Sequence, residues 1–147
     1  MMASRHLACL GGGALALVAA TGWQAAAHAQ EEGVLAIELN KMEDTAQGCL
    51  SSFLFDNRTG HELNRFQIDL VFFDPDGIAA KQLLLDVAPL YQDKKTFASF
   101  LLDATPCDKI GSILVNGVPQ CENGSGAEVG CIDLLKVTSR SEVPLER

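Results

Sequence analysis

Four cysteines give this chain of 147 residues its most distinctive chemistry. They are Cys49, Cys107, Cys121 and Cys131, and a fifth cysteine, Cys9, lies near the start. Four thiols could hold a zinc ion, exchange disulfides with a partner, or form two structural disulfides. Zinc and redox sites usually place two cysteines two residues apart, and no pair in this sequence has that C-x-x-C spacing. We therefore expect two structural disulfides, with redox and zinc sites as the alternatives.

Histidine, the usual acid–base group, occurs once beyond residue 29, as His61. A Ser-His-Asp or Cys-His centre would need this residue, and no G-x-S-x-G motif accompanies it. Histidine-based metal catalysis usually needs two or three such ligands. Both common nucleotide-binding motifs, G-x-G-x-x-G after a strand and G-x-x-x-x-G-K-[ST], are missing from the sequence. We therefore expect no enzyme activity, no cofactor and no metal, and we expect His61 to be an exposed turn residue.

Carboxylates are the remaining groups that could act as catalysts. Asp74 and Asp76 flank a turn, and a small hydrolase would need two such groups roughly 5–10 Å apart in a concave site. A glycosidase would also need an aromatic-lined cleft. The chain has one tyrosine, Tyr91, and one tryptophan, Trp23, which lies in a segment that we expect to be removed. A carboxylate-based hydrolase is therefore kept only as an alternative.

Residues 1–29 have the organisation of a secretory signal peptide. Arg5 and His6 precede an apolar run over residues 7–20, and small residues follow up to the A-x-A sequence of residues 27–29. We expect cleavage after Ala29 and transport by the general secretion route, with a retained membrane anchor as the alternative. An even number of cysteines suits the oxidising compartment that this route reaches. The sequence thus predicts a bacterial periplasmic or secreted protein without stable membrane insertion after cleavage.

The 118 residues from 30 to 147 are enough for one domain and carry a strong negative charge. All 19 acidic residues and 10 of the 11 basic residues lie in this part, so its net charge is 10 − 19 = −9. A surface of this sign repels nucleic acid and anionic lipid. We therefore expect neither of them as a partner.

The elements that would position these groups are organised around residues 64–77, NRFQIDLVFFDPDG. Apolar side chains at every second position would share one face of a β-strand: Phe66, Ile68, Leu70 and Phe72. Their burial would contribute roughly 6–10 kcal/mol before chain entropy is subtracted. On the opposite face Val71 and Phe73 form a candidate interaction patch, unless a neighbouring strand or the tail covers them. The DPDG sequence predicts a type I turn, and a calcium loop is the alternative.

Further short strands are expected around this one, with turn residues between most of them. Including the central strand, their ranges are 34–39, 49–55, 63–73, 81–87, 95–102, 110–115 and 129–137. Residues 81–87 could instead form one or two helical turns. Residues 41–47 are expected to be a turn, and residues 139–147 a flexible C-terminal tail. About seven short strands predict an all-β fold, an antiparallel β-sandwich spanning residues 30–138.

Three motifs within residues 49–102 give this stretch a resemblance to a known family. The FDNRTG turn of residues 55–60 leads into the alternating strand, an aromatic-Asp-x-x-Gly turn ends it, and Pro89 and Leu90 precede Phe97. This pattern resembles the small bacterial immunoglobulin-like modules of the FxLYD type. The chain departs from that family by lacking its tyrosine at Phe72 and Phe73, and by adding four cysteines. The resemblance implies an immunoglobulin-like sandwich with an accessory or binding role, and it brings no catalytic residues.

The strand order that this resemblance implies also favours one pairing of the cysteines. In an immunoglobulin-like order the second and fifth strands are antiparallel neighbours. Cys49 at the start of the second strand would then lie near Cys107, which follows the fifth. Cys121 and Cys131 flank the loop between the last two strands. We therefore expect the disulfides Cys49–Cys107 and Cys121–Cys131, while the other two pairings stay open.

These features lead to three functional hypotheses. The first is an exported, non-catalytic accessory domain that binds another protein, through an open sheet edge or through the patch of Val71 and Phe73. The second is a structural component of a larger envelope assembly. The third is the small carboxylate-based hydrolase. For the first two hypotheses the expected partner is an unidentified envelope protein.

Overall fold

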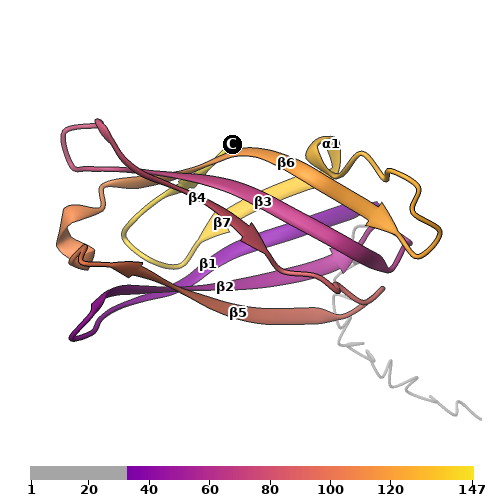
Figure 1. Ribbon diagram of the computed structural model, residues 1–147, viewed down its shortest axis with the longest axis horizontal. Coiled ribbons are helices and arrows are strands. Elements are labelled where there is room, and N and C mark those ends of the chain that lie inside the picture. The colour runs from indigo at the N-terminus through magenta and orange to yellow at the C-terminus, as the bar shows by residue number, and fades with distance from the viewer. Residues whose placement is uncertain (1–32) are drawn as a thin grey trace, which may run out of the picture.

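The computed structural model describes residues 33–147, and the predicted signal peptide of residues 1–29 lies outside the described residues. Strands make up most of the described chain (Figure 1). Its helices are two single turns, η1 at Cys107–Lys109 and α1 at Cys131–Leu134. The predicted all-β class is therefore confirmed. Within residues 33–147, no helix has the length and apolar character needed to cross a membrane.

Eight strands form two four-stranded sheets, which lie as two layers in Figure 1. Sheet A contains, in order, β5, β2, β1 and β7, with the bounds Lys95–Asp103, Gly48–Arg58, Val34–Asp44 and Leu135–Ser139. Sheet B contains, in order, β4, β3, β6 and β8, with the bounds Ala79–Asp86, Leu63–Phe73, Ser112–Asn123 and Leu145–Glu146. The strands β5 and β4 are therefore edge strands of their sheets.

The core lies between the two sheets and contains the inward side chains of both. The alternation predicted for β3 is confirmed, because every member of its apolar set is at most 1% exposed: Phe66, Ile68, Leu70 and Phe72. The ring of Phe55 on β2 meets the ring of Phe66 on β3 edge-on, with 6.1 Å between centroids. This geometry is favourable for aromatic pairs and joins the two layers.

Two strand pairings differ from the purely antiparallel sandwich that the sequence predicts. The strand β7 pairs in parallel with β1, and β8 pairs in parallel with β6. Residues 139–147, predicted as a flexible tail, belong to this arrangement, since Ser139 ends β7 and the buried Leu145 lies in β8. The Ser139 Oγ donates to the Val143 carbonyl at 2.6 Å and stabilises the turn between them. The segment also makes contacts that the prediction of a loose tail did not include: Val143 packs against the core, and the Ile113 N–H donates to the Pro144 carbonyl at 3.0 Å.

Three element boundaries also differ from the prediction. The strand β1 continues to Asp44, into residues predicted as a turn, with a bulge between Leu39 and Lys41. The strand β6 extends to Asn123. Within residues 129–137, predicted as one strand, Gly130 has a left-handed conformation, α1 follows it at Cys131–Leu134, and β7 begins only at Leu135. By contrast, residues 81–86 lie in β4, which confirms the strand over the helical alternative.

Two disulfides fasten the molecule at opposite ends, where η1 and α1 lie in Figure 1. The first joins Cys49, near the start of β2, to Cys107 in η1, with 4.8 Å between their Cα atoms. The second joins Cys121 in β6 to Cys131 in α1, with 6.0 Å between Cα atoms. The strands β2 and β5 are antiparallel neighbours. These disulfides are the two pairs that the implied strand order favours.

Candidate functional site

The carboxylates of the DPDG sequence serve the turn between β3 and β4. The Asp74 Oδ1 accepts hydrogen bonds from the backbone N–H groups of Asp76, at 3.0 Å, and Ile78, at 2.9 Å. The Gly77 N–H donates to the Asp74 carbonyl at 3.0 Å and closes the tight turn. The carboxylate of Asp74, one of the two candidate catalytic groups, is therefore engaged in stabilising its own turn.

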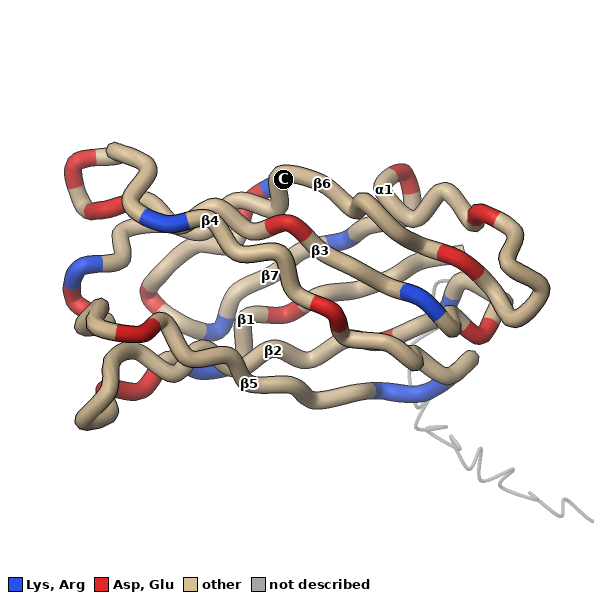
Figure 2. Tube along the Cα trace, viewed as in Figure 1, with Lys and Arg blue, Asp and Glu red and all other residues tan. Residues whose placement is uncertain are grey.

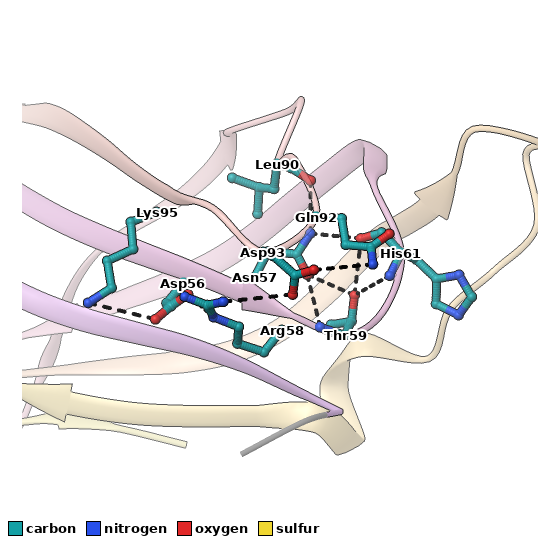
Figure 3. Close-up of polar contacts among 9 residues, drawn as sticks. All are labelled: Asp56, Asn57, Arg58, Thr59, His61, Leu90, Gln92, Asp93 and Lys95. Atoms are coloured by element: carbon teal, nitrogen blue, oxygen red, sulfur yellow. Dashed lines mark hydrogen bonds and ion pairs between the residues drawn. The ribbon is translucent and has the colours of Figure 1, made fainter. Parts of the chain in front are cut away.

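His61 is exposed in the turn that follows β2. Its backbone carbonyl accepts a hydrogen bond from the Asn57 Nδ2 at 2.8 Å. Figure 3 shows the imidazole ring directed away from the polar cluster to which that carbonyl belongs. In the part of the chain that the structure describes, no three His, Cys, Asp or Glu side chains are grouped so that they could hold a metal ion.

Val71 and Phe73, the candidate patch, lie half-buried on the outward face of sheet B. The strands on both sides of β3 place Gln82 of β4 and Leu114 of β6 opposite Val71. Because these strands flank β3 on both sides, the patch is only partly open to solvent.

A larger group of apolar side chains lies on the outward face of sheet A. We call this group the outer patch, and it contains two residues of β2 and two of β5: Leu50, Leu54, Phe97 and Leu101. The register places Leu54 opposite Phe97 and Leu50 opposite Leu101. Phe97 is 59% exposed and Leu101 is 40% exposed. Clustered apolar side chains that remain exposed are typical of interaction surfaces, whereas single ones are not.

A pair of serines lies between the two apolar pairs of the outer patch. Ser52 and Ser99 are opposite each other in the register, and their Oγ atoms are 2.8 Å apart in a hydrogen bond. Cross-strand pairs of this kind stabilise the sheet and fix the two strands in register. The outer patch is therefore a row of facing side chains, apolar at both ends and hydrogen-bonded in the middle.

Among residues 33–147, the strand β5 pairs only with β2, so its other edge is unpaired within the part of the chain that the structure describes. The Lys94 carbonyl accepts from the Asn57 N–H at 3.1 Å, and the Ala104 N–H donates to the Gln47 carbonyl at 2.8 Å. The backbone groups of successive residues point to opposite sides of a strand. Since residues 94 and 104 bond toward β2, the other even-numbered residues of β5 also direct their N–H and C=O groups toward β2. The N–H and C=O groups of residues 95, 97, 99, 101 and 103 therefore face the unpaired edge. At one end of this edge the Lys81 Nζ donates to the Asp103 carbonyl at 2.9 Å.

The start of β5 is positioned by Asn57, a fully buried residue of β2. Its Nδ2 donates to the carbonyls of His61, at 2.8 Å, and Leu90, at 2.9 Å. Its Oδ1 accepts from the Thr59 N–H at 3.1 Å and from the Thr59 Oγ1 at 2.7 Å. Figure 3 shows how this side chain connects the turn after β2 to the loop that leads into β5. Because the buried amide has both its donors and its acceptor satisfied, its burial is not costly.

Four charged side chains form a network beside Asn57 (Figure 3). The Arg58 Nε lies 2.8 Å from the Asp56 Oδ1, and the Arg58 Nη1 lies 3.7 Å from the Asp93 Oδ1. The Lys95 Nζ lies 3.7 Å from the Asp56 Oδ2. The network connects the end of β2 to Asp93 in the loop before β5 and to Lys95 at the start of that strand, and its two 3.7 Å contacts are exposed.

The other end of β5 is fixed by the disulfide and by a close approach of two backbones. Cys49 bonds Cys107, four residues beyond the end of β5. The preceding residue, Gly48, has a φ of 147°, and a Cβ atom there would collide with the carbonyl oxygen of Leu102. Only glycine combines that conformation with that contact. The unpaired edge is therefore held at both ends, which keeps its backbone groups in an extended row.

Opposite charges mark the two ends of β5. Lys95 begins the strand, Asp103 ends it, and both residues are exposed. Figure 2 shows acidic and basic residues interspersed over the molecule, with an uncharged stretch along β5 between its ends. The outer patch is thus bordered by a basic end and an acidic end of the same strand.

The outer patch was not predicted, because residues 95–102, KTFASFLL, have apolar side chains at odd and even positions alike. Periodicity therefore does not choose the inward face of this strand. A signal is nevertheless present: Lys95, Ser99 and Asp103 fall on the same alternation as Phe97 and Leu101. The polar residues Lys95, Ser99 and Asp103 indicate that this set faces solvent, and Phe97 and Leu101 must then be exposed on the same face.

Comparison with protein-family models, with curated proteins and with solved structures finds no match to this chain. The resemblance to FxLYD-type modules therefore rests on the sequence motifs alone and stays a prediction.

Proposed function

We propose that this chain is an exported, non-catalytic accessory domain that acts by binding another protein in the bacterial periplasm. The observation that carries the proposal is the outer patch, with Phe97 at 59% and Leu101 at 40% exposure, beside the unpaired edge of β5. An extended segment added to such an edge gains main-chain hydrogen bonds, while side-chain contacts on the sheet supply specificity. The accessory role implied by the FxLYD-type resemblance agrees with this mode of action.

The build of β5 supports a binding role for its edge. Natural proteins usually protect an exposed edge with prolines, bulges or charges within the strand. The nine residues of β5 contain no proline, their pairing with β2 has no register shift, and the charged residues are confined to the ends. An unprotected edge strand of this kind readily pairs with another strand. We therefore expect a partner to occupy this edge.

The proposed location follows from two features of the chain. Residues 1–29 have the pattern of a secretory signal peptide, and the two disulfides are stable in an oxidising compartment. A reducing cytoplasm would open such bonds. The periplasm combines the export route with that redox environment, and release into the medium is the second destination that fits.

The proposal is tested by capture of partners from periplasmic extract with the tagged mature protein. We expect the wild type to retain a specific protein and the Phe97→Ser variant to lose it, because the substitution removes the most exposed apolar side chain of the outer patch. Leu84→Ser is the matched control, since Leu84 is 58% exposed on β4, the edge strand of the other sheet. Equal recovery by all three proteins, or by none, would contradict the proposal.

The two other hypotheses make different predictions. A structural component of an envelope assembly would use the same surface permanently, so size-exclusion of native extract would place the protein only in a large complex. A carboxylate-based hydrolase has less support, because the Asp74 carboxylate already accepts two backbone N–H groups in its own turn.

A further inference from the structure

We propose that the partner bound at the β5 edge is a second copy of this chain, and that the two copies join antiparallel about a two-fold axis at Ser99. This inference rests on the proposed function, because it names the occupant of the same edge. The two A sheets would then continue into one eight-stranded sheet across the dimer, since each contributes four strands.

The backbone of β5 is suited to this arrangement. A two-fold axis at Ser99 pairs residue 95 with residue 103 of the other copy, 97 with 101, and 99 with itself. All of these positions have their N–H and C=O groups on the unpaired edge, as the bonds at Lys94 and Ala104 establish. In an antiparallel pair, such residues exchange two hydrogen bonds with the residue opposite. If one strand slid by a single residue along the other, the edge-facing backbone groups of one copy would lie opposite groups that are already bonded to β2 in the other copy.

The side chains select this register among those that the backbone allows. On the outward face, Lys95 lies opposite Asp103 of the partner subunit, and Phe97 lies opposite Leu101 of the partner subunit. The symmetry repeats both contacts, so four complementary pairs result. A shift of the axis to residue 98 would oppose Lys95 to a leucine, and a shift to residue 100 would oppose Phe97 to an aspartate. Opposite charges and apolar pairs are the favourable cross-strand neighbours, so the axis at Ser99 fits best.

The self-complementary pattern favours a second copy over an unrelated strand. An isologous dimer requires that one patch complement itself under rotation, and a strand with a lysine at one end and an aspartate at the other meets that requirement. The edge strand β4 of sheet B lacks it: Lys81 and Asp86 are five positions apart, an odd step, so their side chains point to opposite faces of the sheet.

Two contacts within one subunit must be compatible with the dimer. The Lys95 Nζ lies 3.7 Å from the Asp56 Oδ2, a long separation on an exposed surface, so it can also face a carboxylate of the second copy. The Asp103 carbonyl accepts from the Lys81 Nζ at 2.9 Å and from the Thr105 Oγ1 at 3.2 Å, so one of these side chains must move before the carbonyl can accept the N–H of the partner's Lys95. Neither contact involves the backbone groups of residues 97, 99 and 101, which form the middle of the proposed interface.

The test uses charge reversal with the mature protein in sedimentation at physiological ionic strength. The wild type is expected to dimerise reversibly. Lys95→Asp and Asp103→Lys should each weaken dimerisation by at least about tenfold, because each puts like charges opposite each other twice in the symmetric dimer. A mixture of the two variants should restore it, since every 95–103 contact between the unlike chains is again lysine against aspartate.

A second measurement does not depend on charge. Ser99→Cys places two thiols at the two-fold axis, where paired Cα atoms would be about 5.5 Å apart, within the range of a disulfide. Mild oxidation should cross-link this variant, whereas Gln82→Cys on β4 should stay monomeric. A monomeric wild type at all concentrations would overturn the dimer, while capture of another protein through Phe97 would still uphold the proposed function. A dimer that the mixture fails to restore and Ser99→Cys fails to cross-link would refute this register.

Discussion

Replacing Asn57 with alanine removes the side chain that connects the turn after β2 to the loop before β5 (Figure 3). Four hydrogen bonds are lost: two that the amide donates, to the His61 and Leu90 carbonyls, and two that it accepts from Thr59. The site is fully buried, so water does not replace the missing partners without rearrangement. We expect a less stable protein with a displaced start of β5.

The size of the loss depends on which groups keep another partner. At 0.5–1.5 kcal/mol net for each bond, four bonds would sum to roughly 2–6 kcal/mol. The Leu90 carbonyl still accepts from the Leu63 N–H at 2.9 Å, and the His61 carbonyl still accepts from the Thr59 Oγ1 at 3.3 Å. The Thr59 N–H loses its acceptor. We therefore expect a loss of about 3 kcal/mol, a large part of the 5–15 kcal/mol typical of a domain.

Urea denaturation followed by circular dichroism measures this loss. With a slope of about 1–3 kcal/mol/M, the midpoint should fall by about 1–3 M. Asn123→Ala is the control: the Asn123 Oδ1 also accepts from backbone N–H groups and a hydroxyl, those of Ser125 and Ala127, but these bonds lie in the exposed turn after β6. Water can accept hydrogen bonds from the donors left unpaired there, so Asn123→Ala should lower the free energy of unfolding by about 1 kcal/mol or less.

The conservative variant Asn57→Asp separates the two halves of the network. A carboxylate keeps the bonds from Thr59 but cannot donate to the two carbonyls, and it puts a charge in a buried site. It should be destabilised at neutral pH by at least as much as the alanine variant. If Asn57→Ala were no less stable than Asn123→Ala, or Asn57→Asp matched the wild type, the reasoning about this network would be refuted.

Two further predictions concern the disulfides and one carboxylate. Replacing Cys49 and Cys107 with serine, 58 residues apart, should lower the free energy of unfolding by about 4 kcal/mol, against about 3 kcal/mol for Cys121 and Cys131, 10 apart. Thermal unfolding measures both, and a reversed order would contradict the loop-entropy account. A hydrogen bond from Asn40, with the Arg140 guanidinium, holds the pKa of Glu38 below its usual value of 4.5. Its ionised form therefore stabilises the fold above that value, and the contribution disappears as the pH falls through the lowered pKa. Glu38→Gln should lose less stability on acidification, measured by urea denaturation at neutral and acidic pH; an equal loss would count against this role.

The strands whose inward face could be predicted are those in which apolar residues occupy only one of the two sets of alternate positions. Between Arg65 and Phe73 of β3, one set of alternate residues is wholly apolar, whereas the other begins with Arg65, Gln67 and Asp69, so the sequence identifies the inward face. The strand β5 has apolar residues in both sets, and its outward face depends on the register with β2, which no local pattern encodes. This is why the outer patch was missed although the strand itself was predicted.

The parallel pairings could not be predicted for a related reason. The two residues of β8 carry too short a pattern for periodicity, and their place beside β6 depends on Leu145 reaching the core. The short helix α1 follows a left-handed Gly130 and contains Cys131, so the disulfide and the glycine together interrupt what reads as one strand in the sequence. Tertiary contacts decide such segments, not local preference.

The pairing of β1 with β7 also bears on the order in which the chain can fold. Leu35 lies beside Leu135, a hundred residues later, whereas β1 and β2 are connected by a short turn. A chain synthesised from its amino end presents β1 and β2 long before β7. One flank of β1 stays unpaired during that interval, so closure of sheet A waits until β7 has been made.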